Sequence, residues 1–244
     1  MATFVLVHGA WTGAWIWHKV VPILEDRGHE AVTLDLPAHG IDRTPPTDVT
    51  LDDYVDRVCE ALDARDESVV LVGHSMGGVV VTQTAERRPA AVDTLVYLTA
   101  FLPGDGEALV DYSAGDEGSD VGPDLEIDES RGLAILGDDP EAVTAAFYGD
   151  CSRSDHALAL SLRPMGEPLA GVTTPVDVSP ERYGDVRRTY VVCEDDLAIS
   201  PAVQREMYEK QGVDATASLD ASHSPFLSVP AELVDALEAV GLRD

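Results

Sequence analysis

The fold of this chain is decided by residues 68–81, SVVLVGHSMGGVVV, where one serine separates two apolar runs. Residues 68–72 have the composition of a buried strand, and the run that follows Gly78 is typical of a helix. Ser75 is therefore expected at a sharp turn from strand to helix. Glycines suit such a turn, because it strains the backbone and brings the strand and the helix close together. A serine held in this way is a candidate nucleophile.

A serine hydroxyl attacks efficiently only when a base takes its proton and a third group orients that base. His223 has the position expected of the base, because it follows a strand-like stretch at 213–219 and precedes a helix-like stretch at 231–240. The remaining histidines fit helical, turn or supporting positions better: His8, expected to prop the loop after the first strand, His18, His29, His39, His74 and His156. We therefore predict that His223 is the general base.

The acid that orients the base is expected after the strand-like stretch 188–193, which three acidic residues follow at once. Asp196 is favoured, because its distance from the strand lets the chain close a turn before the next helix. Asp195 is the second candidate. Asp105, which follows another predicted strand, is the third, since some hydrolases carry the acid there. All three can also be interpreted as ordinary solvated charges of a very acidic protein.

Ester cleavage places negative charge on the former carbonyl oxygen, and each main-chain N–H that binds it contributes about 3–4 kcal/mol. The residue after the nucleophile, Met76, is expected to supply one such donor. The loop after the first strand, within FVLVHGAW at 4–11, is expected to supply the other, and Ala10 is the candidate. Gly9 lets this backbone approach the substrate closely.

Several stretches of the chain resemble the plant methylesterase and hydroxynitrile lyase family of α/β-hydrolases. The similar stretches are FVLVHGAWTGAWIW at 4–17, LDLPAHG at 34–40, GHSMGG at 73–78, YVVCEDDLAI at 190–199 and SHSPFLSVP at 222–230, together with residues 147–149 and 157–164. The resemblance implies the nucleophile at Ser75, the acid at Asp196, the base at His223 and the oxyanion donors at Ala10 and Met76. It therefore favours Asp196 over Asp195.

The family that the chain resembles holds two chemistries on one catalytic triad. The resemblance implies that lyase members carry a threonine where this chain has Gly9 and a lysine where it has Ser224. Without that lysine a departing cyanide has no electrostatic stabiliser. We therefore predict a serine hydrolase that cleaves a carboxylic ester of a small hydrophobic or aromatic acid through an acyl-enzyme. The alternatives are a lyase that cleaves cyanohydrins and a triad-containing receptor for small molecules with little turnover.

The order of strand-like and helix-like stretches predicts an α/β protein with a mostly parallel sheet flanked by helices. Strands are expected at 3–8, 30–35, 68–73 and 92–100, helices at 16–27, 51–65 and 76–87, and alternation resumes at 187–242. Residues 1–103 and 185–244 are the predicted α/β-hydrolase core. Residues 104–184 are the predicted cap insertion, a small helical one that follows the strand at 92–100. Ligands of such sheets bind at the carboxyl ends of the strands.

The cap is expected to shape the substrate pocket. Helices are expected at 140–147 and 155–162, and the acidic, glycine-rich stretch 111–128 is expected to be a loop. The candidate substrate-binding residues and pocket walls are Gly9, Trp11, Phe101, Leu102, Tyr112, Leu133, Phe147, Leu158, Leu162 and Met165.

The composition restricts the partners of the chain. A formal net charge of −29 over 244 residues repels nucleic acid and anionic lipid. It indicates either adaptation to concentrated salt or an ordinary acidic bacterial enzyme. The three cysteines are widely spaced and predict neither a zinc site nor disulfides.

The N-terminal residues enter a strand without a leader, and no apolar run could span a membrane. We therefore expect a cytoplasmic enzyme, with a halophilic origin as one interpretation of its charge. Its expected partners are a small ester and water, with no metal or organic cofactor, and a homodimer is left open.

Overall fold

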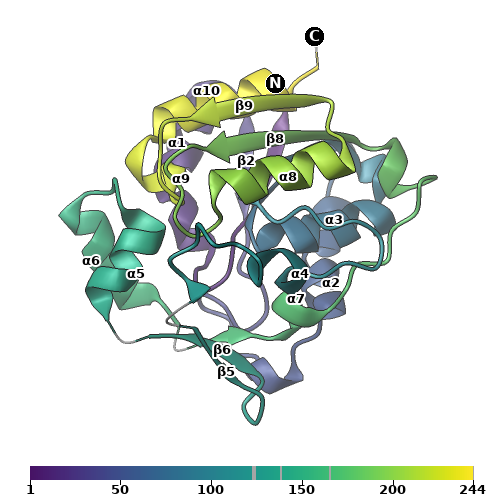
Figure 1. Ribbon diagram of the computed structural model, residues 1–244. Helices are drawn as coiled ribbons and strands as arrows, with labels where there is room; N and C mark the ends of the chain where they lie inside the picture. The colour runs from purple at the N-terminus through teal and green to yellow at the C-terminus, as the bar shows by residue number, and fades with distance from the viewer. Residues whose placement is uncertain (123–124, 138, 165, 244) are drawn as a thin grey trace.

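A computed structural model describes residues 1–122, 125–137, 139–164 and 166–243. A six-stranded sheet forms its centre, in the order β2-β1-β3-β4-β8-β9, and every neighbouring pair is parallel (Figure 1). The strands are β1 (Thr3–Val7), β2 (Glu30–Thr33), β3 (Val69–Ser75), β4 (Val92–Ala100), β8 (Arg187–Cys193) and β9 (Ala215–Leu219). The predicted parallel sheet is confirmed.

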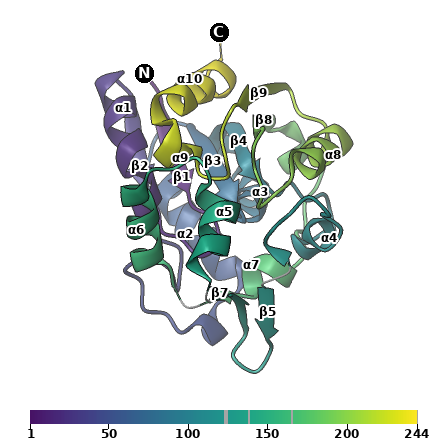
Figure 2. The same ribbon diagram turned by 60° about the vertical axis from the view of Figure 1, so that its left-hand side comes forward.

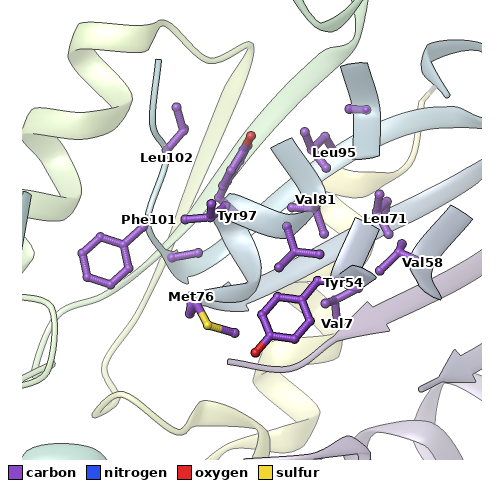
Figure 3. Packing of buried hydrophobic residues seen from close by; sticks show 14 of the residues in the cluster. Val7, Tyr54, Val58, Leu71, Met76, Val81, Leu95, Tyr97, Phe101 and Leu102 are labelled. Carbon is purple, nitrogen blue, oxygen red and sulfur yellow. The ribbon is translucent and has the colours of Figure 1, made fainter. Parts of the chain in front are cut away.

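Helices cover both faces of this sheet, and the alternation of side chains along the strands shows why. Val5, Val7 and Leu71 belong to a core cluster with α2 (Leu51–Asp63) and α3 (Gly77–Arg87), whereas Leu6 and Val72 belong to a second cluster with α1 (Val20–Asp26) and α10 (Pro230–Gly241). Figure 3 shows the first cluster, in which Tyr54 and Val58 of α2 and Val81 of α3 pack on the sheet. Apolar side chains point to both faces, as expected of a parallel sheet between two helical layers.

The helices of this core lie close to the predicted ranges. They are η1 (Ala14–Lys19), α1 (Val20–Asp26), η2 (Pro46–Asp48), α2 (Leu51–Asp63), α3 (Gly77–Arg87), η3 (Pro89–Ala91), η5 (Tyr183–Asp185), α8 (Pro201–Gln211), α9 (Pro225–Ser228) and α10 (Pro230–Gly241). The helix expected at 16–27 begins as a 3-10 helix before α1. No helix among the described residues is long and apolar enough to cross a bilayer.

The region between β4 and η5 contains more strand than the sequence indicates. Its elements are α4 (Val110–Ser113), β5 (Leu125–Asp128), β6 (Leu133–Leu136), α5 (Pro140–Tyr148), α6 (Arg153–Leu162), β7 (Glu167–Pro168) and α7 (Ala170–Thr173). The strands β5, β6 and β7 form a small antiparallel sheet, so the cap that was expected to be helical also contains strands. Figure 2 shows α5 and α6 side by side, away from the end of the molecule that carries the termini.

Two cap predictions have different outcomes. The helices expected at 140–147 and 155–162 are present as α5 and α6, and α6 begins earlier because the Ser152 side chain and Asp155 form a capping box. The stretch 111–128 is not simply a loop, because it contains most of α4 and all of β5. Strands of four residues with acidic flanks leave little periodicity in the sequence, so β5 was missed.

Candidate active site

The serine stands at the turn from β3 to α3. Ser75 is the last residue of β3 and has a φ of +54°, a strained value for a residue other than glycine. The Phe101 N–H donates a hydrogen bond of 3.1 Å to the Ser75 carbonyl and joins the turn to the end of β4. A Cβ atom at Gly78 would lie 2.1 Å from the Phe101 carbonyl oxygen, so only glycine fits there. The sharp turn expected from the sequence is present.

His223 and Asp196 form a buried hydrogen-bonded pair. Nδ1 of His223 lies 2.7 Å from Oδ2 of Asp196, and the two residues are 2% and 1% exposed. Because a carboxylate only accepts, the imidazole carries its hydrogen on Nδ1 and presents Nε2 as a proton acceptor. In the described part of the chain, Ser75 Oγ makes no hydrogen bond to His223. Contacts between nucleophile and base are commonly long until a substrate binds.

The Asp196 carboxylate is held by a set of donors. The Ala198 and Ile199 N–H groups donate to Oδ1 over 2.7 and 2.9 Å, and the Thr99 hydroxyl donates to Oδ2. These donors fix the carboxylate against the ring of His223. The competing candidates lie elsewhere: Asp195 is exposed, and Asp105 accepts a hydrogen bond from the Val178 N–H.

The loop that carries His223 contacts the residue beside the serine and the cap. Nε2 of His74 donates to the His223 carbonyl over 2.9 Å, and the two rings lie 4.6 Å apart. Burial, and then the nearby His223, lower the pKa of His74 well below its usual value, so this ring is neutral. Phe147 of α5 lies edge-on to the His223 ring at 5.5 Å. The imidazole is thus packed between β3 and the cap.

The two candidate oxyanion donors have free N–H groups. Among the described residues, neither the Ala10 nor the Met76 N–H donates to a protein acceptor, and both residues line one cavity with Ser75. The loop before Ala10 is supported by His8, whose Nδ1–H donates to the Gly9 carbonyl over 2.8 Å. Such unpaired amides beside a nucleophile can bind a developing oxyanion.

A cavity of about 610 Å³ opens at the serine. Of the predicted wall residues, Trp11, Phe101 and Phe147 line it. The lining that the sequence analysis missed comes mostly from the cap: Leu109, Val110, Ser113, Ala114, Asp116, Glu117, Ser119, Val121, Gly122, Leu125, Ile127, Ala134, Val172, Thr173, Ala198 and Ile199. Leu125 and Ile127, two positions apart within the acidic stretch, gave only a weak signal for these wall residues.

Other predicted wall residues lie outside this lining, and those expectations are wrong. The Tyr112 hydroxyl donates to Glu107 over 2.5 Å, which turns the ring toward α8. Leu162 is 46% exposed on α6, and Leu158 of the same helix does not reach the cavity. Leu102 and Leu133 are buried in packing that does not face the cavity. Met165 lies outside the described residues.

Gly9 also lies outside the lining, although it is next to the nucleophile. A Cβ atom at this position would stand 2.7 Å from the Cβ of Ser75 and 3.0 Å from the His74 carbonyl oxygen. Gly9 is therefore required for the close approach of the loop to the serine turn, and it does not form a wall of the cavity.

Comparison with known proteins identifies the family that shares this fold. The sequence model of the family described as "Alpha/beta hydrolase family" matches residues 4–236. The chain belongs to the α/β-hydrolase family. It is 34% identical to the alpha-hydroxynitrile lyase of Arabidopsis thaliana, over 97% of this chain and 96% of that protein. It is also 34% identical to methylesterase 1 of Arabidopsis thaliana, with 95% and 93% covered. The crystal structure of polyneuridine aldehyde esterase matches this α/β-hydrolase with a TM-score of 0.88 at 30% identity, covering 98% of this chain and 99% of that one.

Proposed function

We propose that this α/β-hydrolase is a serine esterase that cleaves a carboxylic ester of a small hydrophobic or aromatic acid. The observation that carries the proposal is the buried Asp196–His223 pair, packed beside the turn that presents Ser75. Relatives named as methylesterases and as polyneuridine aldehyde esterase support the same chemistry. Esters of such acids suit a cavity lined largely by apolar side chains.

The reaction begins when Nε2 of His223 takes the Ser75 proton as Oγ attacks the ester carbonyl. Asp196 holds the imidazole in the required tautomer and stabilises the imidazolium. The Ala10 and Met76 N–H groups bind the oxyanion of the tetrahedral intermediate. His223 then protonates the departing alcohol. A water molecule, activated by the same ring, cleaves the acyl-enzyme and regenerates the serine.

Cyanohydrin cleavage is the competing chemistry, because one relative is an alpha-hydroxynitrile lyase. Two positions argue against it. Ser224 stands where the resemblance implies a lysine in the lyases, and the cavity lining includes no lysine or arginine among the described residues, so a departing cyanide would have no such cation to stabilise it. A threonine in place of Gly9 would collide with Ser75. Both observations favour an acyl substrate.

The test compares the wild type with Ser75→Ala on 4-nitrophenyl butyrate and on mandelonitrile. Ser218→Ala is the matched control, because Ser218 stands at an exposed position of β9 outside the cavity lining. We expect steady ester hydrolysis by the wild type and the control, a loss of at least about 10³-fold in Ser75→Ala, and no cyanide release. Equal, slow hydrolysis by all three proteins would instead indicate a receptor.

We further propose the location, the partners and the domain bounds of the enzyme. We infer a cytoplasmic protein that acts on small-molecule esters with water and needs no metal or organic cofactor. The net charge of −29 supports the absence of nucleic-acid and anionic-membrane partners and an adaptation to high salt. The core is proposed to comprise residues 1–103 and 185–244, with the cap at 104–184. A homodimer is compatible with these features.

A further inference from the structure

A glutamate of the cap is fully buried beside the candidate oxyanion loop. Glu167 of β7 is 0% exposed. Its Oε2 accepts one hydrogen bond from the Trp11 N–H and one from Nε2 of His39, each 2.8 Å long. The Tyr54 hydroxyl lies 3.4 Å from Oε1. A carboxylate is seldom buried without compensation, and here the partners are a main-chain amide and an imidazole.

His39 meets this carboxylate as a cation. Its Nδ1 lies 2.9 Å from the Pro37 carbonyl and its Nε2 lies 2.8 Å from Glu167, and since both partners only accept, both ring nitrogens carry hydrogen. Burial opposes the charged ring, but the charge and hydrogen bond of Glu167 outweigh it and raise the pKa of His39. The His8 ring, 4.9 Å away, is kept neutral by burial. Glu167 and His39 therefore form a buried ion pair.

The loop is held on both sides of Ala10. On one side, His8 Nδ1–H and the Thr12 hydroxyl both donate to the Gly9 carbonyl over 2.8 Å. The Gly9 carbonyl and the Ala10 N–H belong to one planar trans peptide and point in opposite directions. These two bonds therefore turn the Ala10 N–H away from His8. On the other side, the next peptide presents its N–H, that of Trp11, to Glu167.

Trp11 itself is strained and doubly attached to the cap. Its φ of +54° is unfavourable for a bulky residue, so its surroundings must hold it in this conformation. The Trp11 indole N–H donates to the Ala134 carbonyl over 3.1 Å. Ala134 and Glu167 are paired across β6 and β7. The small sheet of the cap therefore accepts hydrogen bonds from both the backbone and the side chain of Trp11.

We propose that Glu167, as an ion pair with His39, is a positioning residue that aims the Ala10 N–H at the substrate oxyanion. The proposal rests on the esterase function above. It makes the cap part of the oxyanion hole: the core supplies the amide, and the cap carboxylate fixes the strained turn that presents it. Glu167 itself does not contact the reacting atoms.

A merely structural ion pair would affect stability without a specific effect on the transition state. The two roles are separated by a trifluoromethyl ketone inhibitor, whose hemiketal with the serine places an oxyanion in the hole, and by the corresponding secondary alcohol, which cannot react with the serine and carries no oxyanion. Loss of oxyanion binding weakens the first and leaves the second unchanged.

Three variants are compared: Glu167→Ala, Glu167→Gln and Tyr54→Phe. Glu167→Gln is isosteric and tests the charge if the alanine variant does not fold. Tyr54→Phe is the control, because it removes only the long contact to Oε1. We expect both Glu167 variants to lower kcat by roughly 10- to 100-fold, with KM changed less than about 3-fold. The inhibition constant of the trifluoromethyl ketone should rise in proportion to the loss of kcat/KM. Tyr54→Phe should resemble the wild type in all three quantities.

Contrary results are distinguishable. If the folded Glu167 variants keep wild-type kcat, or lose affinity for the alcohol and the trifluoromethyl ketone equally, Glu167 has no positioning role and the esterase proposal still stands. If the wild type hydrolyses no ester faster than Ser75→Ala, the esterase proposal itself fails. Circular dichroism and unfolding temperature, measured on each variant, identify the folded proteins that enter the comparison.

Discussion

Asp150 of the cap accepts two hydrogen bonds from Ser222, the residue that precedes His223. Its carboxylate receives the Ser222 N–H over 3.2 Å and the Ser222 hydroxyl as well. The cap thus holds the loop of the base through Asp150, just as it holds the opposite loop through Glu167. Both sides of the candidate site depend on contacts from the insertion, although the proposed catalytic residues themselves lie in the core.

Removal of the Ser222 hydroxyl tests this attachment. We expect Ser222→Ala to lower the free energy of unfolding by about 1–2 kcal/mol, because it deprives a carboxylate of a charge-assisted hydrogen bond. It should also reduce kcat several-fold, since His223 loses part of its support. Ser218→Ala, on an exposed position of β9, is the matched control. Urea unfolding and ester hydrolysis measure both effects, and equal behaviour of the two variants would contradict the expectation.

The assignment of the acid is tested by two neighbouring substitutions. Asp196→Asn should lower kcat/KM by roughly 10⁴-fold, because an amide at this position favours the wrong tautomer of the imidazole. Asp195→Asn is the natural control, since Asp195 is exposed and should matter less than about 3-fold. Steady-state kinetics on a nitrophenyl ester supplies the measurement. The reverse order of effects would transfer the role to Asp195.

The charge of the cavity predicts a preference among substrates. Asp116 and Glu117 are the charged side chains of the described lining. An ester with an anionic acyl group should therefore be hydrolysed at least about 10-fold less efficiently than a neutral ester of equal size. Glu117→Gln should recover part of this difference, whereas Glu129→Gln, at an exposed position outside the lining, should not. Equal kcat/KM for 4-nitrophenyl hemisuccinate and 4-nitrophenyl valerate would refute this preference.

The net charge of −29 predicts a strong dependence of stability on salt. Acidic residues outnumber basic ones by 45 to 16, so the folded surface repels itself until salt screens it. We expect the unfolding temperature to rise between 0.05 and 1 M KCl, by about 2–4 °C for each kcal/mol gained. Sucrose at matched osmolality is the control for effects other than screening. No rise with KCl beyond that control would remove the high-salt interpretation.

Short sequence patterns predicted those features of the molecule that depend on residues close together in the chain. Ser75 was correctly expected at a turn, because glycines on both sides of it meet a steric demand that shows in the sequence itself. Glu167 gave no such signal: between Gly166 and Pro168 it looks like an exposed loop residue. Its partner His39 is 128 residues away, and only the folded chain brings them together. The strand β7 was missed for the same reason, because it pairs with β6 from more than 30 residues away, whereas β5 and β6 form a local hairpin whose strands are too short to give a clear periodicity.

The buried histidines predict how stability changes with pH. Burial, followed by the nearby charge of His39, lowers the pKa of His8 to about 3, against an ordinary value of 6.5. Burial also lowers the pKa of His74 well below its ordinary value. Below pH 6.5 the unfolded chain therefore binds protons that the folded chain does not, and the free energy of unfolding falls as pH falls. His39, whose pKa is raised, is protonated in both states below pH 6.5 and adds no slope there.

Urea unfolding at pH 6.0 and 5.0 measures this effect in a window above the range of most carboxylates. The wild type should lose about 2 kcal/mol between these pH values, since each buried neutral histidine contributes at most about 1.4 kcal/mol per pH unit. His8→Asn should lose about half as much, because the asparagine does not titrate, while its amide can still donate to the Gly9 carbonyl as His8 does. An unchanged loss in His8→Asn would mean that His8 takes up a proton in the folded protein, and the neutral support assigned to the Gly9 carbonyl would then be wrong.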